Sequence, residues 1–313
     1  MNNKIRLGMS SCLLGENVRY DGGHKLDNFL RDTLGQWVDY VPVCPEKECG
    51  LPVPREPMRL EGDPTSPRLI VTRTRRDITD QMMTWVNRRI VGLGNENLHG
   101  FIFKSRSPSC GIEQVKVIDE REIPHKIGVG LFAQAFMDHF PLLPVEEEDR
   151  LNDPALRENF ISRIFTLKRW RETPQTVEGL VEFNAHHKLQ IMAHSVTHLR
   201  QMDKLVADLK KIPVAEAFQQ YLEILMPALK LRATCKKNTN ILMHILGCFK
   251  KQLSADEKQE ALEKINLYHN QVVPLIVPIT LLNHYGRKYD QPYLKQQVYL
   301  NPHPAELMLR NHV

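Results

Sequence analysis

The chain has 313 residues, enough for two packed cores, and its 42% apolar and 25% charged content is typical of globular domains. No apolar run approaches the ~20 residues that span a bilayer, and residues 1–15 lack the apolar core of a signal peptide, so we expect a cytoplasmic protein. In that compartment its six cysteines stay reduced, which excludes a disulfide framework and leaves metal binding, catalysis or burial.

Charge divides the chain into two unequal halves. Residues 1–150 carry 20 basic and 22 acidic side chains, whereas residues 151–313 carry 22 and 15. The net charge therefore changes from −2 to +7. This asymmetry indicates either a polyanionic partner for the second half or a solvated helical surface.

The first half alternates strand and helix patterns. Apolar runs bounded by turn residues predict strands at 4–9, 38–43, 68–73 and 100–104, with helices at 27–38 and 77–93 between them. Asp77 and Thr79 are suited to cap the second helix. This alternation predicts an α/β domain, Rossmann-like, with a largely parallel sheet over residues 1–145. Ligands of such sheets bind at the carboxyl ends of the strands, where the first four cysteines fall.

The pattern changes at the proline-rich, acidic segment 140–159, which predicts an interdomain linker over residues 146–160. Beyond it, 3–4 spacing of apolar residues predicts an all-α domain over 161–313, with helices within 176–210, 214–232, 234–252 and 255–273. Ser254 and Glu257 form a capping box for the last of these helices.

Three loops each place one cysteine near the end of a predicted strand. They are 10-SSCLLGENVRYDGG-23, 42-PVCPEKECGLPVPREP-57 and 105-SRSPSCG-111, which contain Cys12, Cys44 and Cys110. Three converging thiolates suit a soft metal or an iron–sulfur cluster, but the spacing matches neither a zinc ribbon nor a ferredoxin. The spacing alone leaves a metal site and buried structural thiols as alternatives.

The motifs S-x-C-L-L-G-x-x-x-R-Y-D-G, P-V-C-P-E, G-L-P-x-P-R and S-P-S-C-G together resemble the TudS-like thiouracil desulfidase family over residues 1 to about 140. The second half resembles the YbgA-like helical domain, in 182-EFNAHHKLQIMAHS-195, 238-NTNILMHILG-247, 274-PLIVPITLL-282 and 298-VYLNPHPAELMLRN-311. The chain is thus similar to the two-domain, RudS-like desulfidases that act on 4-thiouridine in tRNA.

The resemblance implies a [4Fe-4S] cluster bound by Cys12, Cys44 and Cys110, with one iron open to take the thiocarbonyl sulfur. It further implies that Glu46 is the catalytic acid or base and Ser107 the catalytic serine. Cys49 departs from many relatives, which carry glycine there; as a fourth ligand it would close the open iron, and otherwise it is a bystander.

Further residues of the cysteine loops are candidates for substrate binding, either to the base and ribose or to phosphate. They are Arg19, Tyr20, Asp21, Lys104, Arg106 and Ser109. Asp21 is equally suited to a turn, and Ser109 to a structural role in its loop. The G-x-G of 127-IGVGLFAQAF-136 suits an anion at a helix amino terminus, or close packing, which we favour.

In the second half, a basic stretch without acidic residues is expected to follow RNA phosphates. It comprises Lys230, Arg232, Lys236, Lys237, Lys250 and Lys251. Four histidines at 186, 187, 194 and 198 resemble a metal cluster, although a packed bundle face fits their spacing better.

Three functions follow. The first is a tRNA 4-thiouridine desulfidase that uses no net redox change. The second is a desulfidase of free 4-thiouracil or thiolated nucleosides, and the third a non-catalytic, cluster-bearing RNA-binding or redox-sensing protein. We expect a monomer.

Overall fold

The computed structural model describes residues 4–312 and divides into two compact units, Met1–Asp153 and Pro154–Val313. Among the described residues, no helix is both long and apolar enough to cross a lipid bilayer.

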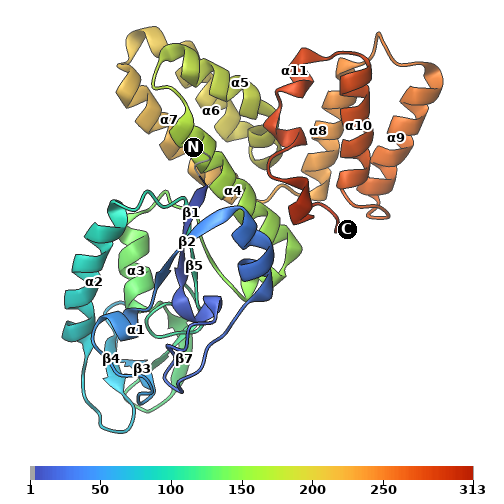
Figure 1. Cartoon of the computed structure of the whole chain (residues 1–313). Coiled ribbons are helices and arrows are strands. Elements are labelled where there is room, and N and C mark those ends of the chain that lie inside the picture. Colours follow the sequence, from blue (N-terminus) through green and yellow to red (C-terminus); the bar gives the residue numbers. More distant parts are fainter. Residues whose placement is uncertain (1–3, 313) are drawn as a thin grey trace. The chain divides into compact units, whose positions relative to one another are not determined.

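The first unit is built on a four-stranded parallel sheet (Figure 1). Its strands run in the order β2 (Val38–Val43), β1 (Ile5–Ser10), β5 (Gly100–Phe103) and β8 (Val145–Glu147). The chain leaves β1 toward one edge through β2 and later returns to its other side through β5, so the strand order reverses between β1 and β5. The carboxyl ends beside such a reversal point are where open α/β sheets bind ligands.

The two faces of this sheet are covered differently. Helices α2 (Thr79–Gly94) and α3 (Leu131–His139) bury Trp85 and Phe132 against Phe101 and Phe103 of β5. The other side holds short irregular turns, η1 (Ser11–Leu14), η2 (Phe29–Thr33) and η3 (Leu34–Gln36) (Figure 1). The helix expected at 27–38 is thus a pair of tight turns.

A second sheet extends this unit, and its strands were only partly expected. Its order is β4 (Arg68–Val71), β3 (Met58–Glu61), β6 (Val115–Ile118) and β7 (Pro124–Gly128). The predicted strand at 68–73 therefore lies outside the parallel sheet and pairs antiparallel with β3. Helix α2 begins beside Ile78, and neither predicted residue occupies its cap position; Thr79 Oγ1 instead accepts from Leu69 N at 2.8 Å.

The predicted linker at 146–160 was wrong in its structure. Its first residues belong to β8, and η4 (Arg150–Asn152) and the start of α4 (Pro154–Glu172) follow. The buried carboxylates of β8 find partners that the sequence does not reveal: Glu146 pairs with Arg150, and Glu147 accepts from Ile112 N at 2.7 Å. An acidic, proline-flanked segment can therefore be an internal strand when tertiary contacts satisfy its carboxylates.

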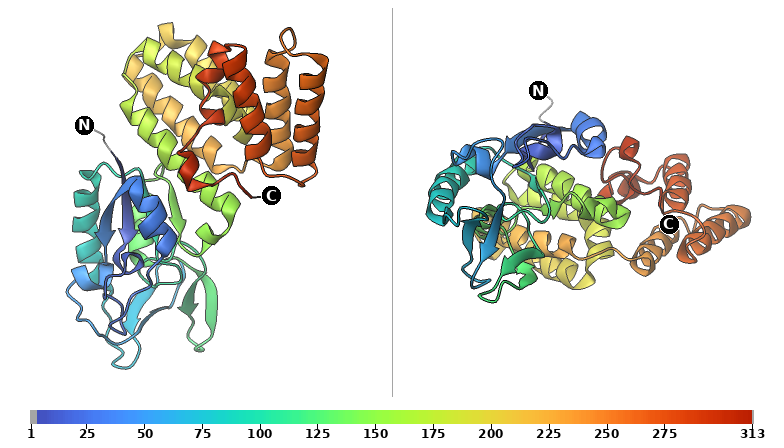
Figure 2. Two further views of the ribbon diagram at one scale, coloured as in Figure 1. Left: turned by 45° about the vertical axis from the view of Figure 1, so that its right-hand side comes forward. Right: turned by 90° about the horizontal axis from the view of Figure 1, so that it is seen from below.

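The second unit is helical (Figures 1 and 2), as predicted. Its longer helices after α4 are α5 (Val177–His194), α6 (Val196–Ala207), α7 (Val214–Lys230), α8 (Cys235–Cys248), α9 (Ala255–His269) and α10 (Ile276–Lys288). The short elements η5 (Leu209–Lys211), α11 (Pro292–Lys295), η6 (Val298–Leu300) and η7 (Ala305–Leu307) complete it. The capping box at Ser254 and Glu257 is present at the start of α9.

Candidate active site

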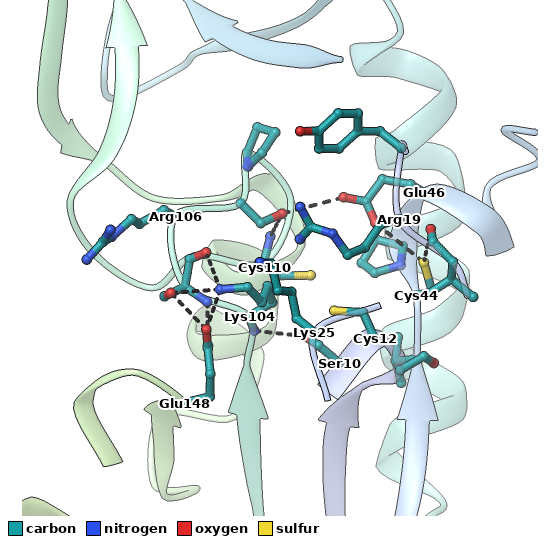
Figure 3. A pocket seen from close by; sticks show the side chains of 18 of the residues that line it. Ser10, Cys12, Arg19, Lys25, Cys44, Glu46, Lys104, Arg106, Cys110 and Glu148 are labelled. Atoms are coloured by element: carbon teal, nitrogen blue, oxygen red, sulfur yellow. Dashed lines mark hydrogen bonds and ion pairs between the residues drawn. The ribbon is translucent and has the colours of Figure 1, made fainter. Parts of the chain in front are cut away.

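Three cysteine thiols line one cavity at the carboxyl ends of the central strands. Cys12 follows β1, Cys44 follows β2 and Cys110 follows β5, and all three line a cavity of about 760 Å³. Each side chain is buried, with 8%, 7% and 3% of its surface exposed. Figure 3 shows their sulfur atoms around the same space. The convergence expected from strand topology is therefore confirmed.

Burial strongly disfavours ionisation of these thiols. Desolvation, followed by the charge of Glu46, raises the pKa of Cys12 to about 11 and that of Cys44 to about 12. The pKa of Cys110 lies well above its ordinary value for the same two reasons. Thiolates at these positions need a compensating positive charge, which a bound metal centre supplies.

Glu46 stands at the centre of the polar contacts. Its residue lies in the single-turn helix α1 (Pro45–Glu48), directly after Cys44. Oε1 accepts from Ser109 Oγ at 2.8 Å and from Ser107 Oγ at 3.4 Å, and Oε2 lies 3.5 Å from Cys44 Sγ. The carboxylate thus joins the second and third cysteine loops.

The two serines of the third loop have different positions. Ser107 lines the cavity, and its Oγ accepts from the backbone N–H groups of Ser109 and Cys110 at 3.2 Å each. Ser109 is fully buried and does not line the cavity. Its expected contact with substrate is therefore wrong, because its hydroxyl is directed at Glu46 from behind the cavity wall.

The third loop is fixed by helix α3. The carbonyl oxygen of Pro108 accepts from Leu131 N, and that of Ser109 accepts from Phe132 N and Ala133 N. These bonds use the amides that an anion would need, so the G-x-G serves close packing. A Cβ on Gly130 would lie 2.4 Å from the backbone carbon of Ser109.

The candidate substrate residues of the first loop divide in two. Arg19 and Tyr20 line the cavity, and the Arg19 guanidinium lies 5.4 Å from the centre of the Tyr20 ring. Asp21 does not line it, and its carboxylate accepts from Gly23 N at 3.0 Å. Asp21 therefore has the turn role, because its side chain satisfies the backbone two residues on.

Lys104 and Arg106 also line the cavity, each with an acidic neighbour (Figure 3). The Lys104 ammonium donates to Ser105 and to Glu148, while Arg106 lies 3.4 Å from Asp149 and extends away from the thiols. Lys104 is thus held in place by a carboxylate rather than left free.

The comparisons with known proteins agree with this site. Residues 7–148 match the family model described as 2-thiouracil desulfurase, and residues 188–304 match a protein family of unknown function, DUF1722. The chain joins a 2-thiouracil desulfurase domain to a DUF1722 domain.

Two individual proteins are similar to parts of the chain. The uncharacterized protein YbgA of Escherichia coli (strain K12) is 28% identical over 165 residues, which cover 51% of this chain and 98% of YbgA. Among solved structures, the [4Fe-4S]-dependent thiouracil desulfidase TudS is 27% identical, with a TM-score of 0.40, and the match covers 49% of this chain and 97% of that one.

The desulfurase domain contains site residues that the sequence did not single out. Arg55 lines the cavity with 7% of its side chain exposed, donates to Val18 O at 3.0 Å, and lies 3.8 Å from Glu46 Oε2. Arg55 ends the G-L-P-x-P-R motif, which was the available signal. Glu148, the partner of Lys104, was hidden in the segment expected to be a linker.

Cys49 does not line the cavity of the desulfurase domain. Its Sγ donates to Glu46 O at 3.3 Å, and its side chain packs against the hydrophobic core. A thiol in this position is a bystander to any ligand in the cavity.

In the helical unit, the four histidines do not form a metal site. His187 stacks on Phe183 with ring centres 3.7 Å apart, His194 donates to Leu231 O, and His198 contacts Ser195 Oγ at 2.7 Å. His186 lies 3.9 Å from Glu182. Across residues 4–312, no group of three Cys, His, Asp or Glu side chains is arranged around a single ion.

Of the expected phosphate contacts, Lys237 is engaged within the protein. Its Nζ donates to His194 O at 2.7 Å and to Arg232 O at 3.0 Å, so it closes the carboxyl end of α5. The other five side chains, Lys230, Arg232, Lys236, Lys250 and Lys251, are exposed.

Proposed function

We propose that this protein is an iron–sulfur desulfidase that converts 4-thiouridine in tRNA to uridine. The observation that supports it is the convergence of three buried thiols and Glu46 on one cavity at the ends of β1, β2 and β5. Membership of residues 7–148 in the desulfurase family gives the reaction class.

Cys12, Cys44 and Cys110 would hold a [4Fe-4S] cluster, leaving one iron without a protein ligand. The donor set fits, because sulfur ligands bind such clusters and because a cluster spreads its ligands over different irons rather than one ion. Arg55 fits too, since its buried Nε has no hydrogen-bond partner among the described residues and its charge faces the cavity. When bound, the cluster supplies a thiophilic Lewis acid for the thiocarbonyl sulfur.

Glu46 would move the protons of the reaction. Replacing the sulfur at C4 by the oxygen of water yields a carbonyl and sulfide, and transfers no electron in total. The water must lose protons while sulfide and the ring nitrogen receive them, which is work for one acid–base group beside the reacting carbon. Ser109 fixes the orientation of the carboxylate through its 2.8 Å hydrogen bond.

Ser107, Arg19 and Tyr20 would position the base. The Ser107 hydroxyl lines the cavity and lies 3.4 Å from Glu46, where it can donate to the pyrimidine or to the attacking water. Tyr20 lies at the cavity with 44% of its surface exposed, so its ring face is available for stacking on a base that has left its RNA stack.

The DUF1722 domain would supply the phosphate contacts. Lys230, Arg232, Lys236, Lys250 and Lys251 are exposed, in a half of the chain with a net charge of +7. Such contacts give affinity that falls with salt rather than sequence reading.

The test is turnover by anaerobically reconstituted full-length protein on thiolated tRNA, on 4-thiouridine and on free 4-thiouracil, followed by the thiocarbonyl absorbance. We expect loss of absorbance with tRNA at the highest kcat/KM, together with one sulfide per uridine formed. Faster loss with the free base would replace tRNA by the base as substrate. An intact cluster without turnover on any of the three would overturn the enzymatic proposal in favour of a sensing or RNA-binding role.

A further inference from the structure

A second cavity, with a volume of about 290 Å³, lies within the helical unit. Its walls come from α4, α5, the first turn of α8, the end of α9 and the carboxy-terminal segment (Figure 1). This size is at the lower end of small-molecule sites, which span roughly 300–1,000 Å³. None of its lining residues belongs to the three cysteine loops.

Two of the polar walls are held rigidly. Asn238, 7% exposed, accepts from Tyr299 Oη at 3.0 Å and donates to Ala233 O at 3.3 Å. Arg310, 9% exposed, donates from Nε to Glu158 Oε1 at 2.7 Å and from Nη1 to Tyr299 O at 2.7 Å. Buried polar groups that are fixed in this way are preorganised to meet a ligand.

His194 offers a hydrogen-bond acceptor to the same cavity. Its ring is 7% exposed, and its Nδ1 must carry the proton because its partner, Leu231 O, can only accept. Burial lowers the pKa of His194 to about 4, so the ring is neutral at neutral pH. Nε2 is then a lone-pair acceptor, and within residues 4–312 it has no hydrogen-bond partner.

We propose that this cavity of the helical unit binds a nucleobase. The Glu158 carboxylate offsets the charge of Arg310, which disfavours a free anion, and the polar walls disfavour an aliphatic ligand. A flat ring with donors and acceptors along its edge matches an acceptor at His194 and donors at Arg310. The volume accommodates a base and not an extended dinucleotide.

The base can come from a free nucleoside or from an unpaired nucleotide of an RNA. Proteins read RNA mainly through such unpaired bases, and exposed basic residues such as Lys236 lie next to the first turn of α8. Only the assignment to RNA rests on the proposed function, since the cavity chemistry itself is independent of desulfuration.

The experiment is equilibrium dialysis of cluster-loaded, full-length protein against labelled adenosine, guanosine, cytidine and uridine, with inorganic phosphate as a further probe. His194→Phe keeps a ring but removes the acceptor, and His187→Phe is the matched control on the same helix, outside the cavity lining. Ala233→Leu narrows the cavity and provides a second variant if His194→Phe does not fold.

We expect at least one nucleoside to bind saturably, about tenfold more weakly in His194→Phe, which is the loss of one buried hydrogen bond, and unchanged in His187→Phe. Binding of phosphate but no nucleoside would overturn the proposal, as would nucleoside binding that neither cavity variant alters. Failure of every nucleoside to bind folded protein would overturn it as well.

Unmodified tRNA distinguishes the two sources. If His194→Phe weakens tRNA binding, the base belongs to RNA; if only nucleoside binding falls, the ligand is free, and either result supports a nucleobase site. Turnover of free 4-thiouracil is measured in parallel. Its absence would count against the desulfidase proposal while leaving these binding results valid.

Discussion

At the scale of single residues, the third cysteine loop separates two serines that the sequence presents almost alike. Ser107 faces the cavity, whereas Ser109 is buried behind it and holds Glu46. The carboxylate accepts its shorter hydrogen bond from the residue outside the cavity. Substrate contact and orientation of the acid–base group are therefore divided between the two hydroxyls.

Glu46→Gln is expected to lower kcat at least 100-fold while the visible spectrum of the cluster stays unchanged. The amide keeps the shape of the side chain but cannot accept and return a proton, and acid–base catalysis contributes about 10²–10⁴ in rate. Cluster absorbance and thiocarbonyl loss are measured on the same sample. Loss of the cluster in this variant would show that Glu46 supports the metal site instead.

Ser109→Ala is expected to lower kcat about tenfold and to leave KM near its wild-type value. Its hydroxyl does not line the cavity, so its removal frees Glu46 without removing a substrate contact. Ser107→Ala, at the cavity surface, should change KM as well. Equal effects of Ser109→Ala on KM and kcat would contradict the division of roles.

At the scale of elements, the site depends on α3 as much as on the strands. The first amides of α3 bond to the carbonyl groups of Pro108 and Ser109, and Gly130 lets the two backbones approach. The loop that presents Cys110 is therefore fixed from its outer side by a helix that contributes no side chain to the cavity.

Gly130→Ala is expected to destabilise the first unit by about 1–3 kcal/mol, because its Cβ would lie 2.4 Å from backbone atoms that cannot rotate away. Thermal unfolding and iron content report the effect. The matched control is Gly92→Ala in α2, where the nearest atom is the end of the Arg89 side chain at 3.6 Å and alanine improves helix propensity. An unchanged melting temperature for Gly130→Ala would contradict the close approach.

Three buried histidines predict acid sensitivity of the helical unit. Burial lowers the pKa of His187 to about 3 and the pKa values of His194 and His303 to about 4, against 6.5 for an ordinary histidine. The unfolded chain therefore binds protons first, and stability present above pH 6.5 is lost as the pH falls toward 4.

Between pH 7.5 and 5.5 we expect a loss of about 1 kcal/mol per histidine in the free energy of unfolding. Denaturant titrations followed through Trp170, which is buried in the helical unit, measure it. His187→Phe should remove about a third of the loss. A pH-independent transition in the wild-type protein would show that these rings are protonated when folded.

At the scale of the whole molecule, the two units differ in charge and in architecture. The α/β unit holds the cavity with the thiols, and the helical unit carries the excess of lysine and arginine. A substrate that carries both a thiolated base and a phosphate backbone addresses both units.

The double variant Lys250→Gln with Lys251→Gln is expected to weaken tRNA binding and to reduce the slope of log K against log salt by about 1–2, because each neutralised phosphate contact removes released counterions. Its control, Lys295→Gln, removes a charge that is already paired with Asp290 at 2.5 Å. Fluorescence anisotropy over a salt series gives both slopes. Equal slopes in all three proteins would place the RNA elsewhere.

The sequence by itself determined the two-part architecture and the site cysteines. Strand-sized apolar runs placed Cys12, Cys44 and Cys110 after consecutive elements, and parallel strands bring such ends to one edge. Glu46 and Ser107 followed from the motifs around them. These features depend on local pattern and on a simple rule of topology.

Only the tertiary structure decided which polar groups meet. The burial of Ser109 behind Glu46, the approach of Arg55 and the pairing of Lys104 with Glu148 each join residues more than 8 positions apart along the chain. The acidic segment became β8 because Arg150 and backbone amides satisfy its carboxylates, and His194 became neutral because helices enclose it. Long-range partners determine burial and charge, and local sequence does not encode them.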